Sequence, residues 1–152
     1  MANPDLVKIA FRLNAEESDG ITRERLRAKP MPDGTFLLDN SPFHVYGVSY
    51  RDSVHAELEE EELVFSGVAQ RGGHSTYRLK LPGGATHGYF LEFWPQLEKL
   101  SCTYEGTSDH RRLYSIDVPP GASVQGVYDI LTRLETAGII EFEEGHYSAR
   151  ED

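Results

Sequence analysis

The sequence has one cysteine and no long apolar run, and these two shortages narrow the classes of protein that it can encode. Because Cys102 is the only cysteine among 152 residues, the chain can form no internal disulfide and no thiolate metal cluster. No apolar stretch approaches the ~20 residues that a membrane-spanning helix needs. Residues 1–5 lack the basic flank and apolar stretch of a secretion signal. We therefore expect a cytoplasmic protein with no membrane partner.

Motifs for catalysis and for cofactor binding are also missing. The six histidines include no pair at helical spacing and no HExxH motif, so no metal site is expected. Gly83-Gly84 lacks the Gly-Lys-Ser/Thr of a phosphate loop, and no GxSxG serine elbow occurs. Cys102 stands in an expected strand, which favours a small buried side chain over a nucleophile. We assign no catalytic residue and no cofactor, and the sequence favours binding over catalysis.

Basic residues are few, with 15 Lys and Arg against 25 Asp and Glu and a formal net charge of −10. Repulsion from phosphates disfavours a nucleic-acid partner. An acidic protein can instead associate rapidly with a basic protein, although the charge can equally serve solubility alone. The apolar share of 39% is enough to build a packed interior, in one domain or two small subdomains.

The first 71 residues are predicted to form a small antiparallel β subdomain. The expected strands cover residues 6–13, 21–31, 35–38, 53–58 and 63–70. Pro32-Asp33-Gly34 predicts a tight turn, and residues 39–42 break the chain after the third strand. The fourth and fifth strands are separated by four adjacent carboxylates, which repel one another and therefore belong at an exposed connection.

Two surfaces are candidates for binding a protein. The first is an acidic tip that could dock a basic partner, with a solvated turn as the alternative; it comprises Glu57, Glu59, Glu60, Glu61 and Glu62. The second is an expected helix at residues 89–100, whose aromatic stripe includes Tyr89 and Trp94. Core packing explains most of this stripe, but any exposed aromatic ring would be an interface anchor. Pro95 predicts that the helix either kinks or begins late.

The second half, residues 72–152, is predicted to be a ferredoxin-like subdomain of order βαββαβ, packed against the first half. Its elements are a strand at 74–81, the helix at 89–100, strands at 102–105 and 113–118, a helix at 124–134 and a strand at 139–142. Ser123 is a suitable N-cap for the second helix, and Gly138 ends it. The whole chain is therefore expected to be an α+β protein.

Alternation along the strand at 74–81 predicts a polar sheet face. In a ferredoxin-like sheet the first and third strands are antiparallel neighbours, which places His74 near Asp117. We expect a patch on the face away from the helices, formed by His74, Thr76, Arg78, Ser115 and Asp117. Arg78 could bind a carboxylate or phosphate, and the His74–Asp117 pair could tune proton affinity. The alternative is a hydrogen-bonded network that packs against the N-terminal strands.

Three stretches, at residues 36–43, 47–52 and 73–78, resemble the domain-of-unknown-function family 4265, a family of small bacterial proteins. The resemblance covers most of the chain and carries over no catalytic residue or cofactor. By analogy alone, small acidic cytosolic proteins of this kind look like immunity proteins that neutralise toxins. The leading expectation is thus a protein-binding module. The alternative is a small-molecule sensor or small enzyme with its site between the two subdomains. The oligomeric state is left open.

Overall fold

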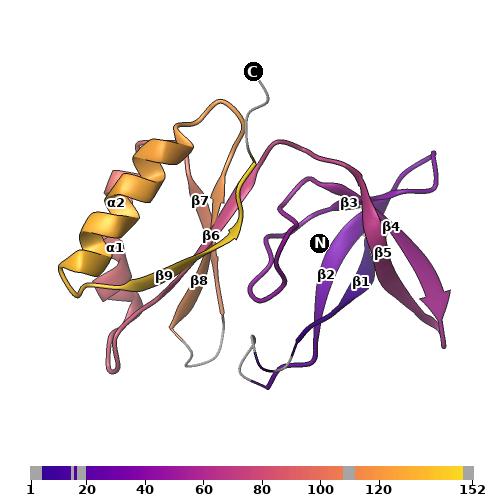
Figure 1. The fold of residues 1–152 in the computed structure, drawn as a ribbon, viewed down its shortest axis with the longest axis horizontal. Helices are drawn as coiled ribbons and strands as arrows, with labels where there is room; N and C mark the ends of the chain where they lie inside the picture. The colour runs from indigo at the N-terminus through magenta and orange to yellow at the C-terminus, as the bar shows by residue number, and fades with distance from the viewer. Residues whose placement is uncertain (1–4, 15, 17–19, 108–111, 149–152) are drawn as a thin grey trace.

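The computed structural model describes residues 5–14, 16, 20–107 and 112–148, which form a mixed α and β structure in two adjacent lobes (Figure 1). The elements are β1 (Val7–Arg12), β2 (Arg23–Pro30), β3 (Phe36–Leu38), β4 (Ser53–Glu59), β5 (Glu62–Gln70), β6 (Ser75–Lys80), α1 (His87–Glu98), β7 (Thr103–Gly106), β8 (Leu113–Val118), α2 (Val124–Thr136) and β9 (Glu141–His146). We name β1–β5 the barrel lobe, and β6–β9 with both helices the sheet lobe.

The barrel lobe is a closed barrel in which β1 pairs with both β2 and β5. The prediction of a wholly antiparallel subdomain is wrong at this seam. There β1 and β5 run parallel, with Ile9 opposite Leu63 and Ala10 opposite Val64. Closure removes the free edges that an open five-stranded sheet would expose. Register shifts between β4 and β5, at Ser53/Val54 and His55/Ala56, supply the extra twist that so small a barrel needs.

Apolar residues that alternate along the strands fill the barrel, as the period of a β-strand requires. Its buried core consists of Ile9, Phe11, Leu26, Ala28, Leu38, Val45, Val48 and Val54. Two of these, Val45 and Val48, come from residues 39–52, which have no regular strand or helix. We name residues 39–52 the connecting segment. It lies between the barrel and the sheet lobe (Figure 1).

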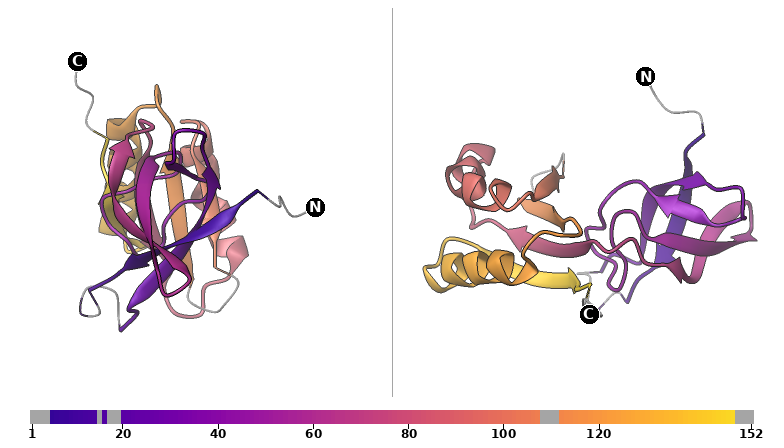
Figure 2. Two further views of the ribbon diagram at one scale, coloured as in Figure 1. Left: turned by 90° about the vertical axis from the view of Figure 1, so that its right-hand side faces the viewer. Right: turned by 90° about the horizontal axis from the view of Figure 1, so that it is seen from above.

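The sheet lobe is a four-stranded sheet of order β7-β8-β6-β9, in which every neighbouring pair is antiparallel. Both helices cover the same face of this sheet, and the barrel lies on the other side (Figures 1 and 2). The core between helices and sheet includes Tyr77, Ile116, Phe90, Leu97 and Leu131. The last strand was predicted at 139–142, but β9 covers Glu141–His146. This strand is largely exposed, and its sequence EFEEGH has no apolar alternation that could have marked its end.

The helix ends follow from local capping. The Ser123 hydroxyl accepts a hydrogen bond of 3.0 Å from the Gly126 amide, which confirms the predicted N-cap of α2. Gly138, at φ +78°, ends that helix. Helix α1 begins at His87 and includes Pro95, so the prediction of a late start is wrong. Its N-cap residue, Thr86, makes no side-chain capping hydrogen bond.

This difference between the two helices gives a matched pair of substitutions. Ser123→Ala should lower the free energy of unfolding by about 1 kcal/mol, because the Gly126 amide loses its acceptor. Thr86→Ala should change it by less than ~0.5 kcal/mol, because no cap is lost. Urea unfolding followed by circular dichroism measures both values. Equal effects of the two changes would contradict the assignment of Ser123 as a cap.

Candidate functional site

The residues predicted to form a polar face do lie on one face of the sheet lobe. Strands β6 and β8 pair with Thr76 opposite Asp117 and Arg78 opposite Ser115. These four side chains point away from the helices, and all four residues are buried. They are not an open surface patch, because the connecting segment covers them. The patch hypothesis is corrected in that respect.

Arg78 is at the centre of this covered face and is only 1% exposed. Its guanidinium donates to the Val45 carbonyl at 2.8 Å, and both Nε and Nη2 contact the Glu143 carboxylate, at 2.8 and 2.7 Å. The group also lies over the ring of Tyr46, with its Cζ 4.6 Å from the ring centre. Gly145 permits this arrangement, since a Cβ there would lie 2.8 Å from Nη1 of Arg78. The buried charge is thus paired and hydrogen-bonded.

Two further hydrogen bonds join the same face to the connecting segment. The Ser115 hydroxyl donates to the Pro42 carbonyl at 2.7 Å. The hydroxyls of Ser49 and Thr76 lie 2.6 Å apart. Polar side chains of the sheet lobe therefore provide hydrogen-bond partners for a segment whose backbone is not paired in a β-sheet. This is the arrangement that buried polar groups require.

His74 and Asp117 come together at the edge of this network. The imidazole Nδ1 lies 2.9 and 3.0 Å from the two carboxylate oxygens of Asp117. The ring of Tyr50 packs edge-on against His74, with ring centres 5.3 Å apart. Burial raises the pKa of Asp117, and the hydrogen bond and charge of His74 oppose that rise. The pair stabilises the junction of the lobes and keeps a buried carboxylate hydrogen-bonded.

Three carboxylates that the sequence analysis did not single out hold the connecting segment in place. Glu24 of β2 accepts hydrogen bonds from the amides of residues 43–45, at 2.7 to 2.9 Å. Asp52 accepts from the amides of Ser49 and Gly72. Glu105 of β7 accepts from the Ser41 amide at 2.6 Å, and burial raises its pKa. No sequence signal separated these acids from surface ones, because each acts mainly on backbone amides; Asp52 also pairs with Arg71, at 3.1 Å.

The acidic tip is the hairpin between β4 and β5. Glu59 pairs directly with Glu62, so Glu60 and Glu61 form a two-residue turn, with φ of 50° and 71°. Two of the acids form ion pairs within the barrel: Glu59 with Arg12, and Glu62 with both Arg23 and Arg25. Glu57, Glu60 and Glu61 are exposed. The tip therefore has fewer unpaired carboxylates than its sequence suggested.

Leu58 stands within this acidic hairpin and is 70% exposed, more than any other large apolar side chain of the described residues. It is preceded by Glu57 and followed by Glu59 in β4. Sequence reasoning missed Leu58, because a leucine in a strand is ordinarily taken as a core residue. Alternation counted from buried Val54 through partly buried Ala56 places Leu58 on the same, inward side of β4, so its exposure is the exception to the pattern.

The aromatic stripe of α1 belongs to the core. Trp94 is only 6% exposed and stacks on Phe90, with ring centres 5.4 Å apart. The Tyr89 hydroxyl donates to the Ile139 carbonyl at 2.7 Å, and the residue is partly buried. The prediction that Trp94 could be an interface anchor is wrong, because helix and sheet enclose it. Cys102 is also buried, and this burial raises the pKa of its thiol to about 12. The thiol is therefore protonated at neutral pH.

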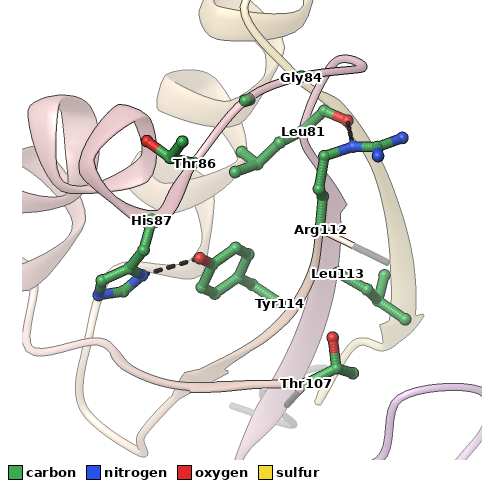
Figure 3. A pocket seen from close by; sticks show the side chains of 9 residues that line it. Leu81, Gly84, Thr86, His87, Thr107, Arg112, Leu113 and Tyr114 are labelled. Atoms are coloured by element: carbon green, nitrogen blue, oxygen red, sulfur yellow. Dashed lines mark hydrogen bonds between the residues drawn. The ribbon is translucent and has the colours of Figure 1, made fainter. Parts of the chain in front are cut away.

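An open pocket of about 440 Å³ lies beside the start of α1 (Figure 3). It is lined by Leu81, Gly84, Ala85, Thr86, His87, Thr107, Arg112, Leu113 and Tyr114. His87 and Tyr114 point toward each other, with Nδ1 2.8 Å from the hydroxyl. Arg112 Nε donates to the Leu81 carbonyl at 3.2 Å. The pocket has room for a small molecule, but these hydrogen bonds are internal and define no ligand.

The described part of the chain shows neither a metal cluster nor a membrane-spanning helix. Within it, no group of three or more His, Cys, Asp or Glu side chains could hold a metal ion. Neither helix in that part is long and apolar enough to cross a membrane. His110, one of the six histidines, lies outside the described residues.

Comparison with known proteins gives a family and a fold. A family model described as a domain of unknown function, DUF4265, matches residues 24–142. No curated protein matches the chain. A solved structure of a hypothetical protein from Neisseria gonorrhoeae is similar over 99% of each chain, with a TM-score of 0.79 and 21% sequence identity. At that identity the likeness shows the fold alone.

The Arg78 network predicts a large loss of stability when the guanidinium is removed. Arg78→Met should lower the free energy of unfolding by ~3 kcal/mol or more, because Glu143 and the Val45 carbonyl lose their partner. Lys80→Met, on the same strand but exposed, should change it by less than ~0.5 kcal/mol. Denaturant unfolding of the two variants measures both changes in the free energy of unfolding. A loss below about 1 kcal/mol for Arg78→Met would show that the lobes do not depend on this group.

His146, at the end of β9, predicts a dependence of stability on pH. Among the described residues its Nε2 is buried and has no hydrogen-bond partner. Burial, and secondly the charge of Arg71, lower its pKa from the ordinary 6.5, against the opposing effect of Asp52 and Glu144. A lowered pKa in the folded state means that the unfolded chain takes up the proton first. Stability is therefore complete above about pH 6.5 and falls as pH drops through the folded-state pKa.

The variant His146→Gln should flatten this decline between about pH 7 and pH 5, because residue 146 no longer titrates. His55→Gln, at an exposed histidine of β4, serves as the control and should leave the decline unchanged. Thermal unfolding across that range measures both. An unaltered decline in His146→Gln would assign the acid sensitivity to other groups.

Proposed function

The chain belongs to the DUF4265 family, and from its structure we propose that it is a non-enzymatic module that binds a basic protein. The observation that carries the proposal is the exposed Leu58 within the acidic β4–β5 hairpin. This hairpin projects from the end of the barrel lobe farthest from the helices (Figure 1). An apolar side chain bordered by carboxylates has the composition of an interface centre with a polar rim.

The ion pairs that anchor the hairpin support the same proposal. Its two-residue turn is tied to β1 and β2 through the ion pairs of Glu59 and Glu62. A partner that binds a pre-ordered tip has less conformational entropy to lose. Glu57, Glu60 and Glu61 remain on the surface beside Leu58 and give the tip its negative charge. With a net charge of −10, the whole molecule also attracts a basic partner over a longer distance.

Toxin neutralisation in the bacterial cytoplasm, as carried out by immunity proteins, is the role that we propose for this binding. The small size and the acidic surface of the chain support it. A basic toxin would be attracted by the negative net charge of the whole molecule and would then bind at the hairpin tip.

The proposal also includes a division of the chain into a β subdomain, residues 1–71, and a ferredoxin-like subdomain, residues 72–152. Three observations support the second assignment: the strand order β7-β8-β6-β9, the antiparallel pairing of every neighbour, and two helices on one face. The chain passes from the barrel to the second sheet between β5 and β6. The hairpin tip and the helices then belong to different subdomains.

A small-molecule sensor or enzyme is the alternative function. A site between the lobes would require Arg78 to exchange the Val45 carbonyl and Glu143 for a ligand. The observation that favours a small molecule is instead the pocket beside α1, which lies within the sheet lobe (Figure 3).

A pull-down from the host bacterium tests the protein-binding proposal. The bait proteins are the wild type and a hairpin variant, Leu58→Ser with Glu60→Lys and Glu61→Lys. The matched control carries the same three kinds of change on exposed residues of α1: Leu91→Ser, Glu92→Lys and Glu98→Lys. We expect one stoichiometric protein to be captured by the wild type and the control, and lost from the hairpin variant.

The remaining outcomes count against the proposal. Capture by all three baits would place the interface away from the hairpin. If the wild type captures nothing at low or moderate salt, the protein-binding function itself is overturned. Circular dichroism of the hairpin variant should match the wild type, because the altered residues are exposed.

A further inference from the structure

A second surface lies on the sheet lobe, along the seam where α2 runs beside β9 (Figures 1 and 2). Four aromatic residues and one carboxylate gather there: Tyr77, Tyr128, Phe142, Tyr147 and Glu144. We name this group the tyrosine cluster. Two of its rings, Tyr128 and Tyr147, are 45% and 49% exposed, so the cluster opens to solvent.

The register of the sheet explains why these side chains meet. In the β6–β9 pair, Tyr77 is opposite Glu144 and Leu79 is opposite Phe142. Directly paired residues project on the same face, so all four lie on the helix side of the sheet. There the ring of Phe142 has Tyr77 at 6.2 Å and Tyr128 of α2 at 6.0 Å, between ring centres. Four of the five residues thus stand on β6, β9 and α2, and Tyr147 follows directly after the end of β9.

The carboxylate of Glu144 is the charged member of the cluster. The Tyr77 hydroxyl lies 3.5 Å from its Oε1, a long hydrogen bond. Burial raises the pKa of Tyr77, and the charges of Glu144, Tyr147 and Tyr128 raise it further. Glu144 itself is exposed, and no ion pair to it is found among the described residues. The surface therefore offers one negative charge within aromatic walls.

The other face of the same strand shows what such a group of side chains binds. There Tyr46 donates to the Glu143 carboxylate at 2.7 Å. Arg78 completes that site, pairing with Glu143 and lying over the ring of Tyr46. Glu144, the next residue, has its tyrosines but no arginine within the described part of the chain. The two faces of β9 thus carry related acid–tyrosine pairs, one with a guanidinium and one without.

We propose that the tyrosine cluster binds an arginine side chain of a protein partner. Aromatic faces carry negative potential and attract cations, and Glu144 adds a formal charge. A planar guanidinium can stack on a ring and pair with a carboxylate at the same time, which an ammonium cannot do equally well. An anion would be repelled, and a purely apolar group would leave Glu144 desolvated. The site is independent of the β4–β5 hairpin, which lies on the other lobe.

Titration with two short peptides tests the proposal. The probes are acetylated and amidated tetra-arginine and tetra-lysine, which carry equal charge. Isothermal titration at about 50 mM salt keeps electrostatic attraction measurable. Tetra-arginine should bind about threefold or more tighter than tetra-lysine, because stacking favours guanidinium. Its addition should also shift the amide resonances of residues 128, 142 and 144.

Substitutions locate the site. Glu144→Gln and Tyr128→Ala should each weaken tetra-arginine binding about threefold to fivefold. The matched control is Glu141→Gln, which removes the same charge from the same strand, at an exposed residue on the opposite face. It should change the affinity by less than about twofold. Equal losses in Glu141→Gln and Glu144→Gln would show that only net charge attracts the peptide, and would overturn the proposal.

Two further variants separate this site from its alternatives. Leu58→Ser should leave tetra-arginine binding unchanged, whereas loss of binding would move the peptide to the hairpin. Arg150 of the same chain lies outside the described residues and is three positions after Tyr147. If Arg150→Ala raises the peptide affinity several-fold, the chain's own arginine occupies the cluster and the assignment to a partner is overturned. An unchanged affinity of the Arg150→Ala variant for tetra-arginine supports a partner's arginine as the occupant.

Discussion

The guanidinium of Arg78 is the group on which the arrangement of the two lobes depends. A charge that is 1% exposed is tolerated only when neighbours pair with it and accept its hydrogen bonds. Here those neighbours come from both lobes: Glu143 from the last strand, and Val45 from the connecting segment. An apolar interface of the same size could slide or repack, whereas the directional hydrogen bonds of the guanidinium favour a single position.

The carboxylates of this acidic chain divide into two groups by what they contact. Glu24, Asp52 and Glu105 accept hydrogen bonds from backbone amides and hold a segment that has no secondary structure. Glu59 and Glu62 pair with arginines of the barrel wall. The surface charge that a partner can meet is therefore carried by the remaining acids. For this reason net charge alone is a poor guide to where the protein binds.

Sequence patterns predicted the elements of the sheet lobe and its polar face, because alternation and strand order constrain both. Once β6 and β8 were taken as antiparallel neighbours, geometry required His74 to lie near Asp117, and their atoms are 2.9 Å apart. A hydrogen-bonded network packed against the N-terminal half was one of the two sequence-based interpretations, but the groups that cover the face were not predictable. Val45 and Pro42 act through carbonyl oxygens, which every residue carries. Closure of the barrel was also missed, since strand alternation does not identify the partner of an edge strand.

Strand β9 contributes Glu143 to the lobe interface, and this has a consequence for synthesis on the ribosome. All five barrel strands precede residue 71 in the chain, so the barrel can close while the rest is still being made. The connecting segment then stays uncovered until β6 and β8 have emerged. Arg78 acquires its counter-charge only once β9, which carries Glu143, has been made. The nascent chain therefore carries Arg78 without its carboxylate partner while residues 79–143 are being made, and the contacts between the lobes are complete only after β9 has emerged.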